Sequence, residues 1–336
     1  MSEILAKFQN ILNQFTNDTV HELELLAQSG SSRRYFRLHT ANGSYIGTEG
    51  KDLKENEAFI SLARHFNYQQ VSVPKLLAHT DDFRYYIQED LGNTSLYNFL
   101  PAPGEAHTQD LFALYLKSVD LLLSVHTRGS QSIDFGHCYP TADFDALSIQ
   151  WDLEYFKYYF LKLNDLSYDE YALQEELDQL RDMVAAIPRN CFMVRDFQSR
   201  NIMIRDEQPV LIDFQGGRRG PYHYDLVSLL WQARANLPHQ WKDELKDRYL
   251  KGLSESVSLD EAAFNKDYWL IVLIRTMQVL GAYGLRGVVQ RKQHFLSSIP
   301  FAVENLKYLL VEKSWYLPAL PQIKHAFIEY INRKSN

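Results

Sequence analysis

The stretch that decides the fold is Phe192-Met-Val-Arg-Asp-Phe-Gln-Ser-Arg-Asn-Ile-Met-Ile-Arg205, which is followed shortly by Val210-Leu-Ile-Asp-Phe-Gln215. Short apolar runs alternate here with polar segments, a pattern that predicts a strand, a polar loop, a second strand, a tight turn and a third strand. Asp196 and Asn201 fall in the loop, and Asp213 falls at the end of the third strand. Because the second and third strands form a hairpin, we expect these three side chains to converge at its mouth.

The three side chains match what the transfer of a phosphoryl group requires. Such a reaction needs a carboxylate that orients the attacking hydroxyl group, and oxygen ligands that hold magnesium against the phosphates of a nucleotide. We expect Asp196 to be the catalytic base, and Asn201 and Asp213 to bind Mg²⁺. A single loop aspartate is more often a solvated strand end, but the ordered combination of all three favours the functional interpretation.

The same residues resemble a known family. Residues 195–201 and 212–215 are similar to the catalytic core of the aminoglycoside phosphotransferase/choline kinase family, small-molecule kinases that share the two-lobed protein-kinase fold. Within the family, the chain most resembles the bacterial kinases that phosphorylate N-acetylmuramate and N-acetylglucosamine at the anomeric hydroxyl group. This finer resemblance rests on residues 31–37, 89–92, 199–200, 220–221, 224–226 and 279–281. It implies ATP and Mg²⁺ as cofactors and an amino sugar as the substrate.

The chain departs from the kinase pattern at two places. Val194 stands where the family usually has a histidine that stabilises the loop. The third strand, 45–49, has no lysine at the place where protein kinases carry the one that pairs with the nucleotide phosphates and with a helix glutamate. Glu57 in the following helix matches that glutamate in kind, whereas Lys51 and Lys54 fit solvated side chains better. The amino-sugar kinases also lack this lysine, so the departure fits the finer resemblance.

Nucleotide contacts are expected at two segments in the N-terminal part of the chain. The small residues of 28–32 form a turn whose backbone N–H groups could cover phosphates, with Ser31, Ser32 and either Arg33 or Arg34 at the site. The resemblance further implies a hinge at 88–91, so that Glu89 and Leu91 border the adenine. Arg200 lies inside the catalytic loop, where its charge could stabilise the transferring phosphate.

The acceptor pocket is expected in the helical part of the chain. Residues 151–159 and 275–286 mix aromatic and hydrogen-bonding side chains, as sugar sites do. Arg275 and Gln278 are one helical turn apart and would share a face. Arginines here would suit a neutral or anionic sugar, whereas a polycationic aminoglycoside would need clustered carboxylates.

The periodicity and the resemblance together predict an α+β fold of the protein-kinase type. Residues 1–92 would form an N-terminal helix and a small antiparallel nucleotide-binding lobe that ends at the hinge. Residues 93–336 would form a larger, mostly helical lobe with the catalytic loop and the substrate pocket. Helical spacing predicts helices at 3–16, 54–66, 108–127, 143–163, 169–186, 224–235, 238–253, 260–281, 295–311 and 318–333, and strands are expected at 21–26, 34–38, 44–48, 75–79 and 85–88.

Composition narrows the remaining function classes. The formal net charge of −7 over 336 residues argues against a nucleic-acid partner, which would favour a basic face. We expect no run of the chain to be long and apolar enough to span a bilayer, and we expect no membrane partner. The beginning of the chain lacks a signal-peptide pattern, and Cys138 and Cys191 fit a reducing compartment, so we expect a cytoplasmic protein.

Three alternatives compete with the amino-sugar kinase. An aminoglycoside, choline or homoserine kinase would share the same catalytic loop. A nucleotide-binding pseudokinase or scaffold is motivated by the missing strand lysine and by Val194. A protein kinase fits worst, because Tyr224 follows Gln215 by only nine positions, too few for a peptide-docking activation segment.

Overall fold

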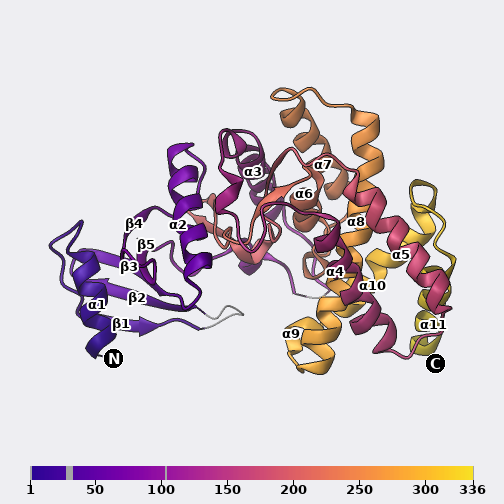
Figure 1. Cartoon of the computed structure of the whole chain (residues 1–336), viewed down its shortest axis with the longest axis horizontal. Helices are drawn as coiled ribbons and strands as arrows, with labels where there is room; N and C mark the ends of the chain where they lie inside the picture. Colours follow the sequence, from indigo (N-terminus) through magenta and orange to yellow (C-terminus); the bar gives the residue numbers. More distant parts are fainter. Residues whose placement is uncertain (1, 28–32, 103, 336) are drawn as a thin grey trace. The chain divides into compact units, whose positions relative to one another are not determined.

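The computed structural model describes residues 2–27, 33–102 and 104–335, and the chain packs into two compact units (Figure 1). Unit 1 comprises Met1–Ala102, Thr108–Ala142 and Val194–Arg218. Unit 2 comprises Pro103–His107, Asp143–Met193 and Arg219–Asn336. The sequence analysis expected lobes at 1–92 and 93–336, whereas by contacts the catalytic hairpin and residues 108–142 group with the N-terminal residues.

Unit 1 is built on a five-stranded antiparallel sheet with the strand order β1-β2-β3-β5-β4. Helix α1 lies along this sheet (Figure 1), and its Phe8 ring contacts the rings of Phe36 and Tyr85 at centroid distances of 5.5 and 5.8 Å. Burying these aromatic rings supplies much of the core between helix and sheet. The strands are β1 (Glu22–Leu25), β2 (Arg34–Thr40), β3 (Gly43–Glu49), β4 (Leu76–His79) and β5 (Tyr85–Glu89), and α1 is Ser2–Leu12.

Helix α2 (Leu53–Tyr68) joins the sheet to the catalytic hairpin within unit 1. The Asp52 side chain caps the helix by accepting a hydrogen bond from the Glu55 N–H at 3.2 Å. Phe59 stacks on Tyr86 of β5 on one side, at 4.7 Å, and on Phe214 on the other, at 5.1 Å. These stacked rings fix the segment that carries Asp213 against the helix.

The catalytic hairpin consists of β7 (Ile202–Arg205) and β8 (Gln208–Leu211), paired antiparallel. Its turn is as tight as expected, because only Asp206 and Glu207 lie between the strands, with φ angles of 49° and 58°. The remaining elements of unit 1 are α3 (Gln109–His126), η1 (Leu96–Phe99), η2 (Arg128–Ser130), η3 (Phe135–His137) and η5 (Ser199–Asn201).

Unit 2 is mostly helical, with the long helix α8 (Glu261–Tyr283) packed against α4, α6 and α10. At the crossing with α4, a Cβ atom on Gly281 would lie 2.4 Å from the carbonyl carbon of Tyr155, so only glycine allows this close approach. The other elements are α4 (Ala146–Phe156), η4 (Lys157–Lys162), α5 (Glu170–Ala185), β6 (Cys191–Met193), β9 (Arg218–Gly220), α6 (His223–Leu230), η6 (Ala233–Ala235), α7 (His239–Ser254), η7 (Gly284–Val289), α9 (Gln293–Leu296), α10 (Ile299–Glu312), η8 (Ser314–Tyr316) and α11 (Pro321–Ser335). Strands β6 and β9 form a two-stranded sheet.

We expected no run long and apolar enough to span a membrane, and by length and composition alone this expectation is wrong. The helical segment Glu261–Val289 spans 29 residues with a mean hydropathy of 1.3 over its most apolar window, enough to pass as a membrane span. However, 72% of that window is buried within the protein, as in the core helix of a water-soluble fold. Its apolar character is therefore explained by packing in unit 2.

The predicted fold class is confirmed. A small antiparallel sheet is accompanied by a larger helical part, and the predicted strands and main helices appear within a few residues of their expected positions. The largest differences are at helix ends. The first helix stops at Leu12 instead of 16, the helix predicted at 224–235 stops at Leu230, and the one predicted at 143–163 changes at Lys157 into a wider π-helical turn.

Candidate functional site

The catalytic loop is held in shape by Asn201. Its Nδ2 donates hydrogen bonds to the backbone carbonyl of Asp196 at 2.9 Å and to Oδ2 of Asp213 at 3.5 Å. Its own backbone carbonyl accepts from the Ile212 N–H at 2.9 Å. The structure therefore brings together the three residues on which the sequence analysis depends, all within unit 1, whereas their catalytic roles stay predictions.

Two residues in or next to this cluster have a backbone conformation that L-residues rarely adopt. Arg195, just before the candidate base, has a φ of 77°, and Asp213 has a φ of 62°. Such conformations cost of order 1–3 kcal/mol each and persist where the surrounding structure holds them, which is often at functional sites. Here the two unusual conformations lie at both ends of the cluster, next to Asp196 and at Asp213 itself.

The donor set around Asp213 suits a hard cation such as Mg²⁺. Asp213 is exposed, and its Oδ1 accepts a hydrogen bond from Nε2 of Gln215 at 2.7 Å. In the described part of the chain, the buried Oε1 of Gln215 has no hydrogen-bond partner, so an amide oxygen stands free beside the carboxylate. No group of three or more His, Cys, Asp or Glu side chains exists among the described residues. Magnesium fits such a sparse oxygen set, because it takes few protein ligands and keeps waters and phosphate oxygens.

Arg200 remains a candidate for stabilising charge. It is exposed in the short helix η5, and within the described residues its guanidinium forms no ion pair. A cation without a carboxylate partner is available to a phosphate group.

On the nucleotide side, Ser31 and Ser32 lie outside the described residues. Arg33 is 1% exposed and forms an ion pair with Glu55 of α2, with 2.7 Å between Nη2 and Oε1. Glu57 was expected to be the helix partner, but it forms no ion pair within the described chain. Two positions along a helix correspond to a rotation of about 200°, so Glu55 and Glu57 cannot face the same partner.

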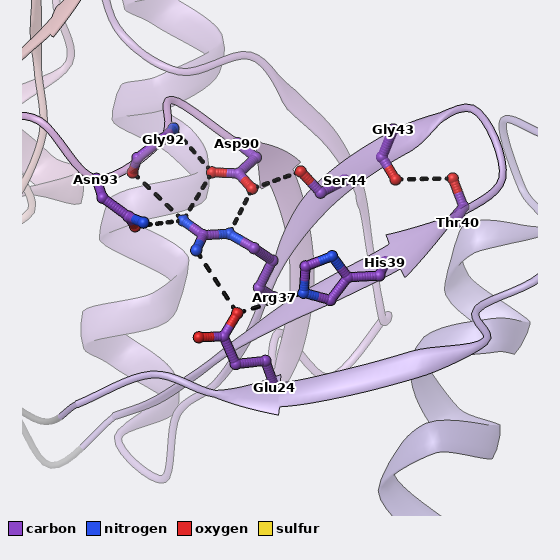
Figure 2. A network of polar contacts seen from close by, with 9 residues as sticks. All are labelled: Glu24, Arg37, His39, Thr40, Gly43, Ser44, Asp90, Gly92 and Asn93. Atoms are coloured by element: carbon purple, nitrogen blue, oxygen red, sulfur yellow. Dashed lines mark hydrogen bonds and ion pairs between the residues drawn. The ribbon is translucent and has the colours of Figure 1, made fainter.

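The predicted hinge is anchored by Arg37 of β2 (Figure 2). Its guanidinium contacts both carboxylate oxygens of Asp90, at 2.6 and 3.2 Å, and donates to the carbonyl of Gly92 at 3.3 Å and to Oδ1 of Asn93 at 2.7 Å. Ser44 of β3 adds a hydrogen bond to Asp90 at 2.7 Å. This network connects the segment that follows β5 to β2 and β3, and it fixes the turn at Gly92.

Burial and these hydrogen-bond donors shift the pKa of Asp90 in opposite directions. Burial disfavours its charged form, but the hydrogen bonds from Arg37 and Ser44 outweigh that cost and hold the pKa of the carboxyl group below its ordinary value. Of the two hinge residues named from sequence, Glu89 pairs with Arg205 at the end of β7, whereas Leu91 is half-buried. The pairing links the hinge to the catalytic hairpin within unit 1.

The residues proposed for the acceptor are held by the core of unit 2. Arg275 is buried, donates to Oγ of Ser228 at 3.1 Å, hydrogen-bonds to Gln278 and lies over the ring of Tyr224. These contacts explain its position without a ligand, so its role toward the acceptor stays a prediction.

Unit 2 also has a cavity, and it lies away from the residues proposed for the acceptor. It has a volume of about 420 Å³ and is lined by residues 236–239, Lys242 and parts of α10. Neither Arg275 nor Gln278 lines it.

Sequence reasoning missed Glu55, Arg37 and Gln215. Arg37 and Gln215 were noted only as parts of motifs, with no role of their own, and Glu55 was not noted at all. For Glu55 a usable signal did exist, because it follows an N-capping Asp52 by three positions and so lies in the first helical turn.

The sequence profile of the phosphotransferase enzyme family (APH) matches residues 22–262, which include the sheet of unit 1, α2 and the whole catalytic hairpin. The chain belongs to this family. As a phosphotransferase it is a kinase that acts on a hydroxyl acceptor.

Curated relatives extend over almost the whole chain. The N-acetylmuramate/N-acetylglucosamine kinase of Neisseria meningitidis serogroup B is 26% identical over 312 residues, which cover 90% of this chain and 89% of the relative. The enzyme of the same name from Caulobacter vibrioides is 25% identical, with 92% of each chain covered.

Solved structures support the fold of this phosphotransferase. The choline kinase of Cryptosporidium parvum has a TM-score of 0.64 at 14% identity and covers 94% of this chain and 98% of its own. An amicoumacin kinase in complex with AMP-PNP, Ca²⁺ and Ami has a TM-score of 0.58 at 14% identity, with 91% and 93% covered. At these identities the likeness shows the kinase-like fold.

Proposed function

We propose that this phosphotransferase transfers the γ-phosphate of ATP, with Mg²⁺, to the anomeric hydroxyl group of an amino sugar of the N-acetylmuramate or N-acetylglucosamine type. The observation that carries the chemistry is the Asn201 side chain, whose hydrogen bonds join the candidate base segment to Asp213. The acceptor is supported by the relatives of that name, which match about nine tenths of the chain. A solved neighbour holds a nucleotide analogue with a divalent cation, which supports the cofactor pair.

In the proposed reaction, Asp196 accepts the proton of the acceptor hydroxyl group as its oxygen attacks the γ-phosphorus. The bond between that phosphorus and the β–γ bridging oxygen breaks, and ADP leaves with the bond's electron pair. Asn201 and Asp213 would hold Mg²⁺, which neutralises charge on the phosphates when bound. Arg200 would add positive charge near the transferring group.

The substrate class and location follow from the same proposal. N-Acetylmuramate carries a carboxylate, and N-acetylglucosamine is neutral, so neither needs the clustered carboxylates that a polycationic antibiotic would need. We assign the enzyme to the cytoplasm, where ATP is available and where the free thiols of Cys138 and Cys191 would persist. No nucleic acid or membrane takes part in the proposed reaction.

An ADP-release assay tests the proposal. The protein is incubated with Mg²⁺-ATP and, in turn, N-acetylmuramate, N-acetylglucosamine, kanamycin, choline and homoserine. We expect turnover with the two amino sugars. Turnover with kanamycin alone would refute the acceptor while leaving the kinase intact.

Asp196→Asn is the matched variant for the chemistry. It should lower kcat by about a hundredfold or more, the scale of a lost general base, while ATP affinity stays near that of the wild type. Near-wild-type turnover in Asp196→Asn would remove Asp196 from the mechanism.

The alternative of a nucleotide-binding pseudokinase is favoured by one observation. The third strand ends in Thr48 and Glu49, both buried, with no lysine to hold phosphates. Under this alternative, no acceptor would release ADP, and nucleotide binding would be the whole activity.

A further inference from the structure

The missing strand lysine leaves a position that another cation must fill if the enzyme binds ATP in the kinase manner. In kinases, a strand lysine pairs with a helix glutamate and steadies the nucleotide phosphates. Here Glu49, at the end of β3, is itself paired with Arg34 and accepts a hydrogen bond from Tyr85. Lys51 and Lys54 follow the strand as exposed side chains. The third strand therefore supplies no cation.

A buried arginine just before the neighbouring strand forms the equivalent of the missing pair. Arg33 immediately precedes β2, is 1% exposed, and contacts Glu55 in the first turn of α2 at 2.7 Å. Taking a guanidinium out of water is costly, and it is tolerated when a carboxylate and hydrogen bonds compensate the charge. The structure thus joins the sheet and α2 by an arginine–glutamate pair in place of lysine–glutamate.

The same arginine contacts a tyrosine hydroxyl group that is also within electrostatic range of the candidate metal ligand Asp213. Its Nη1 donates to the hydroxyl group of Tyr35 at 3.4 Å. Burial raises the pKa of Tyr35, Arg33 opposes that shift, and Asp213 adds to it, so both charged groups act on the same hydroxyl. Arg33 and Asp213 therefore both lie within electrostatic range of the Tyr35 hydroxyl group.

We propose that Arg33, held by Glu55, is the cation that positions the nucleotide phosphates in this enzyme and replaces the strand lysine of other kinases. The inference rests on the proposed ATP-dependent function. It assigns the pairing to Arg33 and leaves its neighbour Arg34 outside the phosphate site, because Arg34 is paired with Glu49 and is half exposed.

Binding measurements test this assignment separately from turnover. The affinities of Mg²⁺-ATP, ADP and adenosine are measured by calorimetry for the wild type, Arg33→Met, Arg33→Lys, Glu55→Gln and, as the matched control, Arg34→Met. For Arg33→Met we expect the ATP affinity to fall by about ten- to a hundredfold, the range for a lost charge-assisted contact, while adenosine affinity is unchanged. Arg33→Lys should recover part of the loss, and Arg34→Met should bind ATP like the wild type.

A purely structural role would give a different pattern. It would lower the affinities of adenosine and ATP by the same factor, which would overturn the inference, as would a selective loss of ATP affinity in Arg34→Met. If Arg33→Met does not fold, Glu55→Gln decides, because it keeps the cation and removes its anchor. A several-fold selective loss of ATP affinity is expected there, and unchanged affinity would contradict the proposal. Wild-type ATP binding without phosphorylation of any acceptor would refute the proposed function but leave this inference standing.

Discussion

Asp213 has an exposed carboxylate and a strained backbone, and its carboxylate accepts hydrogen bonds from the side-chain amides of Asn201 and Gln215. Its φ of 62° is held by the hairpin and by the stacking of Phe214 on α2. Within the described chain, the amide oxygen of Gln215 has no hydrogen-bond partner, so it could serve as a second oxygen ligand. At the scale of single residues, this concentration of strain and oxygen donors is the clearest sign of a metal-binding role.

The first prediction therefore concerns metal-dependent nucleotide binding. Asp213→Ala should abolish the Mg²⁺ dependence of ATP affinity, because a hard carboxylate ligand is lost where few exist. Calorimetry with Mg²⁺ and with EDTA measures it in the wild type and the variant. Equal ATP affinity of the wild type under both conditions would instead favour the pseudokinase.

At the scale of elements, the Arg37 network decides how firmly the hinge is attached to the sheet. The Asp90 side chain is 7% exposed and forms its ion pair with Arg37. Removing one member of a buried pair leaves an uncompensated charge. We expect Arg37→Met to lower the free energy of unfolding at pH 7 by about 3 kcal/mol.

The same network predicts a pH dependence. The pKa of Asp90 is lowered from its ordinary value of 3.8, so its contribution to stability is present above that pH and is lost as the pH falls through the lower folded-state value. The difference between wild type and Arg37→Met should therefore shrink below about pH 4. Urea unfolding at pH 7 and pH 3.5 measures it, with the surface variant Arg181→Met as control, for which a change under about 1 kcal/mol is expected. A loss that is equal at both pH values would contradict this account.

The crossing of α4 and α8 gives a prediction about packing. In Gly281→Ala the new Cβ would lie 2.4 Å from backbone atoms of Tyr155, which cannot yield as a side chain could. We expect a loss of about 1–3 kcal/mol in the free energy of unfolding despite the better helix propensity of alanine. Gly216→Ala is the control, since nothing lies within 4 Å of its Cβ position, and it should change stability by less than about 0.5 kcal/mol. Equal effects of the two substitutions would show that the crossing is not tight.

The elements also show what sequence could predict and what it could not. Asp196, Asn201 and Asp213 lie on one hairpin, so local strand and turn rules were enough to bring them together. The Arg37–Asp90 contact joins residues 53 positions apart, and it depends on the sheet order, which no local pattern encodes. The choice of Glu55 over Glu57 depends on the rotation of α2 about its axis. The π-helical turn after α4 continues the aromatic pattern, so periodicity alone predicted an unbroken helix.

At the scale of the whole molecule, the residues proposed to bind the nucleotide and the metal and to act as the base all belong to one packed unit of this phosphotransferase. Unit 1 contains the sheet, α2, the hinge and the catalytic hairpin. The expected acceptor residues belong to unit 2, where the bonds of Arg275 to Ser228 and Gln278 are explained by the core. The proposed identity of the acceptor therefore rests on the relatives.

Phosphorus NMR of the product makes that measurement. The protein is incubated with Mg²⁺-ATP and N-acetylmuramate, N-acetylglucosamine or kanamycin, and the position of the new phosphate is read from its coupling to the sugar protons. The account predicts a sugar phosphate coupled to the anomeric proton for both amino sugars, formed at least about a hundredfold more slowly by Asp196→Asn. A phosphate on another hydroxyl group of the sugar, or phosphorylated kanamycin with both sugars unchanged, would contradict it.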